Sequence, residues 1–159
     1  MNKKAKILIA ILVIAVVAIA VAVMKPGNSS GQKEEMRTII DATGEKIEVP
    51  AHPKKIAIGA MVLPHMVYAL QKNADNIVSI PPAAYSGWEI SILKDLAPEL
   101  KDVDTTMVND DFTVNVEALA NAGVDLVINW DTQTDQAQQL KKLGIPCALV
   151  SSAKNMDDL

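Results

Sequence analysis

Residues of the kinds that carry out catalysis or bind metals are few in this chain, and their spacing suits neither task. Its two histidines, His52 and His65, form no H-x-x-x-H or H-E-x-x-H motif, and Cys147 is its single cysteine. A zinc site built from local sequence needs such pairs. The chain also lacks a G-x-G-x-x-G motif and a Walker loop, the sequences that hold nucleotide phosphates. We therefore predict a protein that is not an enzyme and has no metal or cofactor of its own.

Aromatic side chains are the second group with a chemical use, because a ring buries much of a flat ligand's surface at low entropic cost. The chain has only five aromatic residues, and three of them fall in or beside segments that follow predicted strands: Tyr85, Trp88 and Trp130. Trp88 fits equally well as a residue that packs beneath its own helix. Asp110 and Asp111 are interpreted as part of a solvated loop.

The elements that must position these rings follow an α/β pattern. Short apolar runs alternate with helical segments, which is typical of a parallel sheet flanked by helices. We expect a loop over 81–87 and a helix over 88–96. Ahead of them, 38–41 and 46–49 flank a turn that contains Gly44 and predict a hairpin. The predicted parallel strands are 56–60, 77–80, 124–130 and 145–150.

Two further helices are expected from their capping residues. Asn115 is a good amino-terminal cap, and Gly123 is a suitable stop for the helix that it begins. Thr132 or Thr134 can cap the second helix. The apolar residues of that helix recur at helical spacing: Ala137, Leu140 and Leu143.

Ligands of open parallel sheets sit beyond the carboxyl ends of the strands. Three predicted loops lie there, namely 60–62, 84–88 and 130–132. We expect the ligand to contact residues from all three: Met61, Tyr85, Trp88, Trp130 and Asp131.

The amino-terminal residues 1–24 predict export. Residues 7–24 are 18 consecutive apolar residues, and three lysines precede them. Such a run can span a bilayer, and the lysines favour a cytoplasmic amino terminus. It serves either as a membrane anchor or, with cleavage after 20–22, as a signal peptide that releases the protein. Residues 25–36 read as a flexible linker and 37–159 as one globular domain outside the cytoplasm.

The net charge of −4 becomes more negative when the three amino-terminal lysines are left out. An acidic domain repels phosphate backbones, so nucleic acid is not expected as a partner.

A family resemblance runs from Arg37 to the end of the chain. It is carried by an ordered set of short motifs: Asn115-Val116-Glu117 with Leu119, Asp125-Leu126-Val127-Ile128, and Leu143-Gly144-Ile145-Pro146. These residues resemble the amino-terminal lobe of the periplasmic-binding-protein class that serves cobalamin, iron-siderophore and haem importers. Val124 departs from the proline that this class carries before the aspartate.

The resemblance implies an extracytoplasmic substrate-binding component of an ABC importer. Its ligand would be a metal chelate such as an iron siderophore, haem or a corrinoid, and its partners the importer's permease and ATPase. Glu117 matches the position that docks on the permease in this class, although it also suits a helix start as an acid favoured by the macrodipole.

Relatives of this class continue into a second lobe and bind ligand between the two, so we expect a truncated chain with one wall of the cleft. The alternative is a membrane-tethered single-lobe module whose exposed wall contacts another protein.

Overall fold

The computed structural model describes residues 35–60 and 63–152. Its centre is a sheet of four parallel strands in the order β4-β3-β5-β6. An isolated parallel bridge between Ser79 and Asp104 extends the sheet beyond β4. The strands are β3 (Ile56–Ile58), β4 (Ile77–Ser79), β5 (Leu126–Trp130) and β6 (Cys147–Val150).

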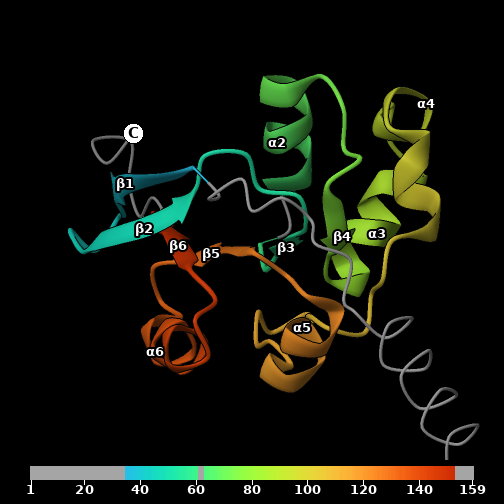
Figure 1. Ribbon diagram of the computed structural model, residues 1–159. Coiled ribbons are helices and arrows are strands. Elements are labelled where there is room, and N and C mark those ends of the chain that lie inside the picture. Colours follow the sequence, from blue (N-terminus) through green and yellow to red (C-terminus); the bar gives the residue numbers. More distant parts are fainter. Residues whose placement is uncertain (1–34, 61–62, 153–159) are drawn as a thin grey trace, which may run out of the picture. The chain divides into compact units, whose positions relative to one another are not determined.

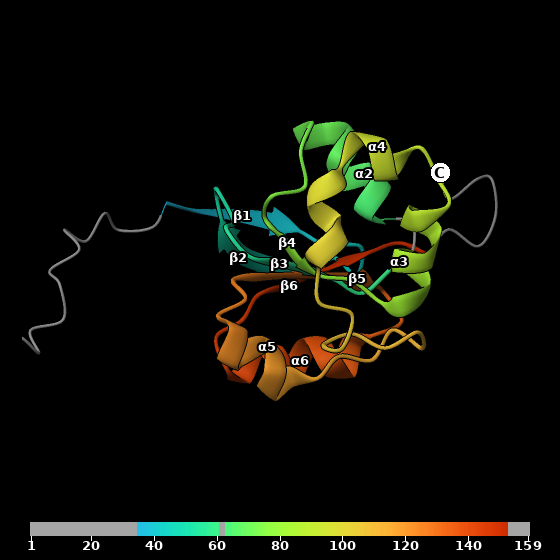
Figure 2. The ribbon, with the colours of Figure 1, turned by 90° about the vertical axis from the view of Figure 1, so that its right-hand side faces the viewer.

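Helices cover both faces of this sheet (Figures 1 and 2). On one face lie α2 (Leu63–Gln71), α3 (Pro82–Glu89) and α4 (Leu93–Leu96), followed by a 3-10 helix, η1 (Pro98–Asp102). On the other face lie α5 (Val116–Ala122) and α6 (Thr134–Lys142). Each face has its own hydrophobic cluster, because successive residues of a strand point to opposite sides. The predicted fold class, a parallel sheet between helices with an added hairpin, is confirmed.

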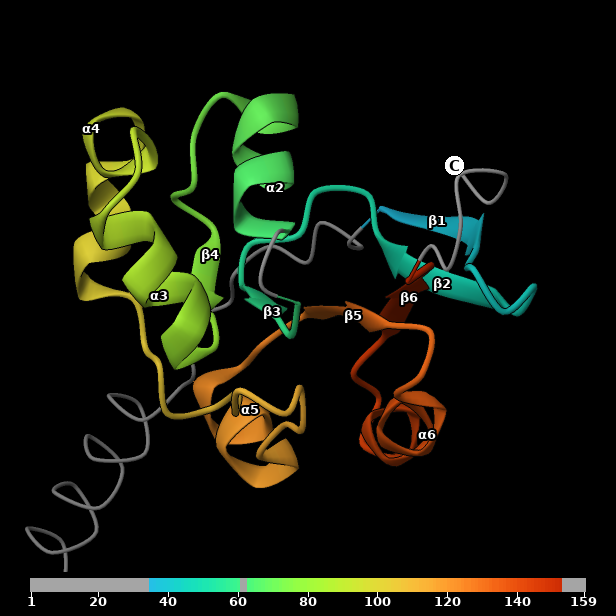
Figure 3. The same cartoon turned by 180° about the vertical axis from the view of Figure 1, so that it is seen from behind.

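The hairpin pairs β1 (Met36–Ile40) with β2 (Lys46–Pro50) in antiparallel register. Its turn needs a positive φ, which Gly44 supplies at 85°. The amide of Ala42 donates to the carbonyl oxygen of Leu149 at 2.9 Å, so the turn lies against β6 (Figure 3). Because β6 is an edge strand, the hairpin covers part of an edge that would otherwise invite pairing with another chain.

Two predicted helix starts are wrong. The structure begins α3 at Pro82, where a loop over 81–87 was expected, because proline is well suited to the first turn of a helix. The chain then breaks at Ile90 and resumes as α4. Neither Thr132 nor Thr134 caps α6, since its cap position is Gln133 and Thr134 is already helical. The predicted cap Asn115 and stop Gly123 of α5 are confirmed.

Within residues 35–60 and 63–152 no helix is both long and apolar enough to cross a bilayer. The predicted anchor or signal, 1–24, and most of the predicted linker lie outside the described residues. The strand β1 begins at Met36, the last residue of that expected linker.

Candidate ligand-binding edge

The carboxyl ends of the strands bring together two of the residues expected to contact ligand. Trp130 is the last residue of β5, and Asp131 follows it directly. The Asp131 carboxylate accepts a hydrogen bond of 2.7 Å from the Ser152 hydroxyl, and the Asp131 amide donates to Val150 at 2.9 Å. Asp131 therefore ties the end of β5 to the end of β6. Met61, which follows β3, lies outside the described residues.

Tyr85 and Trp88 lie on α3, one turn apart, with ring centroids separated by 5.2 Å. The Tyr85 ring is half-buried, and its hydroxyl donates to the carbonyl oxygen of Lys101 at 3.1 Å. The Trp88 side chain is only 3% exposed, and its Nε1 donates to the carbonyl oxygen of Ala97 at 3.0 Å. In this structure Tyr85 is partly exposed, whereas Trp88 packs beneath its helix, which is the second of its two interpretations.

Phe112 joins Trp130 at this edge, a pairing that the sequence did not reveal. The two rings meet edge to face, with centroids 6.4 Å apart and planes at 84°. Phe112 occupies the tip of a tight turn in which the amide of Asn109 donates to the carbonyl oxygen of Thr113 at 2.8 Å. Its φ of 68° is in the left-handed region, which bulky residues rarely adopt. No local sequence signal marks Phe112 beyond its being aromatic.

The turn around Phe112 is fastened to α3 by Asp110. The Asp110 carboxylate accepts a hydrogen bond of 2.8 Å from the amide of Ala83, at the amino-terminal end of that helix. Beside it, Asp111 accepts hydrogen bonds from the hydroxyl and amide of Thr113, which lower the pKa of the Asp111 carboxyl below its ordinary value. The segment interpreted as a solvated loop therefore braces the helix that carries Tyr85.

A buried amide lies directly beneath the aromatic pair. Asn129, 1% exposed, donates through Nδ2 to the carbonyl oxygen of Phe112 at 2.9 Å and accepts through Oδ1 from the amide of Trp130 at 2.9 Å. It lies against Gly59, the residue that follows β3, where an added Cβ would stand 2.3 Å from Oδ1 of Asn129.

Glu117 follows Phe112 by five residues in the chain but has a different setting. It lies exposed in the first turn of α5. The cap of that helix is Asn115, whose Oδ1 accepts from the amide of Ala118 at 3.0 Å. Exposure is what a docking acid requires, and the position equally suits an acid at a helix start.

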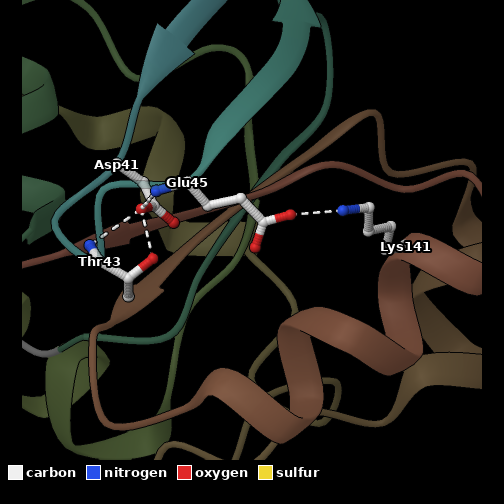
Figure 4. Close-up of polar contacts among 4 residues, drawn as sticks. All are labelled: Asp41, Thr43, Glu45 and Lys141. Carbon is white, nitrogen blue, oxygen red and sulfur yellow. Dashed lines mark hydrogen bonds and ion pairs between the residues drawn. The ribbon is translucent and has the colours of Figure 1, made fainter.

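A separate groove of about 390 Å³ lies between the hairpin and α6. Across it the Lys141 ammonium of α6 forms an ion pair with the Glu45 carboxylate (Figure 4). Close by, Asp41 accepts hydrogen bonds from Thr43 and Glu45. Burial raises the pKa of Asp41, but these hydrogen bonds outweigh it and leave the pKa below its ordinary value. Of the residues expected to contact ligand, none that the structure describes lines this groove.

The described residues hold no cluster of three or more His, Cys, Asp or Glu side chains that could bind a metal ion. Cys147 is buried in β6 within the cluster beneath α5 and α6. Burial, followed by the nearby negative charge of Asp41, raises the pKa of the Cys147 thiol to about 12. The thiol is therefore protonated at neutral pH, and a thiol is a poor metal ligand.

No protein-family model matches the chain, and no curated protein does. A solved structure of a periplasmic solute-binding protein from Veillonella parvula matches 78% of this chain at 35% identity, with a TM-score of 0.73. That match spans 37% of the Veillonella protein. The chain has the fold of one lobe of a periplasmic solute-binding protein.

Two more distant structures match the lobe in fold alone. Staphylococcus aureus SirA, solved in complex with staphyloferrin B, is 17% identical over 74% of this chain, with a TM-score of 0.53, and the match spans 37% of SirA. A variant of the haem-binding protein HmuT is 20% identical over 84% of this chain, with a TM-score of 0.54, and the match spans 39% of HmuT. The lobe thus spans less than half the length of each of the three proteins.

Proposed function

We propose that this lobe is the ligand-capturing wall of an extracytoplasmic substrate-binding component of an ABC importer, and that its ligand is an iron chelate such as a ferric siderophore or haem. A cobalamin-like corrinoid belongs to the same class of ligand. The permease and ATPase of the importer are its proposed partners. Residues 1–24 would hold it at the membrane as an anchor or, if cleaved, direct its release.

The observation that carries this proposal is the aromatic surface at the carboxyl edge of the sheet. Phe112 and Trp130 meet there, and Trp130 and the half-buried Tyr85 pack against the same hydrophobic cluster. Open parallel sheets bind ligands at this edge, and rings suit large flat ligands. The fold shared with SirA and HmuT supports the choice of an iron chelate.

A single lobe forms only one wall of a ligand pocket, and we expect it to bind a ligand weakly. Formed pockets bury about 70 to 90% of a ligand's surface, whereas a single lobe covers one side of it. We therefore expect the lobe alone to bind a chelate far more weakly than a two-lobe relative does.

Tryptophan fluorescence tests the proposal. In a Trp88→Phe variant Trp130 is the remaining indole, and ferric staphyloferrin B or haemin should quench it in a saturable manner. The Trp130→Phe variant is the matched control, because its remaining indole is buried and bonded to Ala97. Equal quenching in both variants, or no saturable quenching by any chelate of a wide panel, would contradict the proposal.

A single-lobe protein-interaction module is the second candidate. It is favoured by large apolar side chains that stand in solvent on α2 and around the α3–α4 break: Leu70 (84% exposed), Ile90 (90%) and Ile92 (73%). Exposed apolar surface of this kind marks association sites. Light scattering of the isolated domain tests the candidate, which predicts self-association that Ile90→Lys abolishes. A monomer at high micromolar concentration would exclude self-association through this surface.

A further inference from the structure

Asn129 is a polar residue at a buried position where an apolar side chain would cost less free energy to bury. It follows Val127 by two residues in β5, so it points to the same face, the one that α5 and α6 cover, and its side chain is almost fully buried. A buried amide costs free energy unless its groups are hydrogen-bonded. Both ends of this amide have partners, Phe112 through Nδ2 and Trp130 through Oδ1.

The two partners are the two members of the aromatic pair. One side chain therefore holds the backbone of the turn that carries Phe112 and the backbone of the strand that carries Trp130. The hydrogen bond from Asn129 to Phe112 fixes a strained residue, because the φ of 68° at Phe112 is unfavourable for a side chain of this size. Such strain persists only where the surroundings fix it, and it gathers at functional sites.

Gly59 makes the room that Asn129 occupies. A Cβ at Gly59 would lie 2.3 to 2.6 Å from the three atoms of the amide group, which is closer than real contacts allow. The amide of Gly59 donates to the carbonyl oxygen of Ile128 at 2.8 Å, so its backbone is fixed beside β5 and has little freedom to retreat. Glycine is needed here for space.

We infer that Asn129, seated against Gly59, is a positioning residue that sets the Phe112–Trp130 pair in the geometry that faces the ligand. This inference rests on the proposed function for its purpose. Its structural content, the coupling of the two rings through one amide, is measurable without any ligand.

Fluorine NMR of the protein labelled with 5-fluorotryptophan reads that coupling. The chain has two tryptophans, so two signals are expected, and the Trp88→Phe variant assigns them. Asn129→Leu keeps the number and branching of the side-chain heavy atoms but removes both hydrogen bonds. It should shift the Trp130 signal and leave the Trp88 signal in place. Phe112→Ala should also shift the Trp130 signal. Adding Asn129→Leu to Phe112→Ala should then move the Trp130 signal by less than Asn129→Leu moves it in the parent protein, because the two residues act together.

Asn76→Leu is the matched control. Asn76 is a less deeply buried amide whose Nδ2 donates to a backbone carbonyl, that of Pro53 at 3.1 Å, and it lies at the amino-terminal ends of β3 and β4, whereas Trp130 ends β5. Its replacement should lower stability without moving the Trp130 signal. A folded Asn129→Leu protein with an unmoved Trp130 signal, or an equal shift in Asn76→Leu, would overturn the inference.

Gly59 supplies a second test that does not depend on the folding of Asn129→Leu. Gly59→Ala should lower the melting temperature through its clash with the amide. Adding Asn129→Ala should restore much of that temperature by removing the clashing group, yet the Trp130 signal should stay displaced. Recovery of both together would show that Asn129 only fills space, and would overturn the inference.

A binding measurement separates this inference from the proposed function. The affinity of Asn129→Leu for ferric staphyloferrin B should fall by about tenfold if misplaced rings bind it less well. If the parent chain binds neither that chelate nor haemin, the proposed function fails, while the ligand-free NMR still decides the role of Asn129. If the parent binds and the displaced rings leave affinity unchanged, the positioning role is overturned.

Discussion

The indole nitrogen of Trp88 in α3 donates a hydrogen bond of 3.0 Å to the carbonyl oxygen of Ala97, the residue between α4 and the 3-10 helix η1. Both residues are almost fully buried. A single side chain thus links the helix that carries Tyr85 to the segment that leads to Lys101, whose carbonyl oxygen accepts from the Tyr85 hydroxyl.

Trp88→Phe should therefore destabilise the domain by about 0.5 to 1.5 kcal/mol, because it removes a buried hydrogen bond to the carbonyl oxygen of Ala97, which keeps only the one from the amide of Leu100 at 3.2 Å. Urea unfolding followed by circular dichroism measures the change. Trp130→Phe is the control and should cost less, since Trp130 is only partly buried. Equal losses would show that the Trp88 hydrogen bond adds little.

Glu117→Ala should leave stability nearly intact and weaken docking. An acid in the first turn of an exposed helix contributes about 0.3 to 1 kcal/mol, whereas truncating one partner of a desolvated interfacial ion pair costs about 2 to 5 kcal/mol. We expect a melting temperature within a few degrees of the parent and association with the cognate permease weaker by more than about tenfold.

The neighbouring cap provides the matched control for Glu117. Asn115→Ala removes the hydrogen bond to the amide of Ala118 and should destabilise the domain by about 1 kcal/mol without a specific effect on docking. A large stability loss in Glu117→Ala with undiminished permease binding would mean that Glu117 is only a helix-start acid.

Cys147 should react slowly with Ellman's reagent at pH 8 in the folded protein and rapidly after unfolding. Its pKa of about 12 keeps the thiolate fraction very small, and burial blocks access. The raised pKa also contributes stability that is complete below the unfolded pKa of about 8.5 and is lost as pH rises toward 12. Cys147→Ala should show a shallower alkaline loss of stability, and an unchanged profile would contradict this assignment.

Asp104 should make the domain acid-sensitive. Hydrogen bonds from the amide and hydroxyl of Thr106, at 2.6 and 2.7 Å, lower the pKa of Asp104 despite partial burial. A lowered pKa contributes stability that is present above the unfolded value of about 3.9 and disappears as pH falls below it. Asp104→Ala should therefore flatten the fall in unfolding free energy below about pH 4. Thr106→Val, which removes only the hydroxyl donor, should flatten it partly.

The sheet could be predicted from the sequence because its strands are buried runs with clear boundaries, and because Asn115 and Gly123 act through local chemistry. The start of α3 was missed, since residues 81–87 were assigned to a loop although proline favours a first helical turn. That error placed Tyr85 in a loop and left the orientation of Trp88 open.

The role of Asn129 beneath the Phe112–Trp130 pair could not be predicted from the sequence, for a different reason. The hydrogen bond from Asn129 to Phe112 joins residues 17 apart and exists only after the turn has folded back onto β5. Asn129 itself lies in an apolar run, and no sequence pattern there indicates whether its polar side chain has a role or is merely tolerated. The left-handed backbone of Phe112 is held by its tertiary contacts against its own preference, which no local pattern records.

The order of the strands also affects how fast the domain can fold. The central strand β3 pairs with β5, and the amide of Lys55 just ahead of it bonds to Asp125, 70 residues later in the chain. Contacts of such long sequence separation close large loops and slow folding. Until β5 arrives, β3 lacks its neighbour on that side, and neither the seat of Asn129 nor the aromatic edge exists. We therefore expect a nascent chain to pass through a stage in which the sheet centre is open to mispairing, and the candidate edge to be among the last features to form.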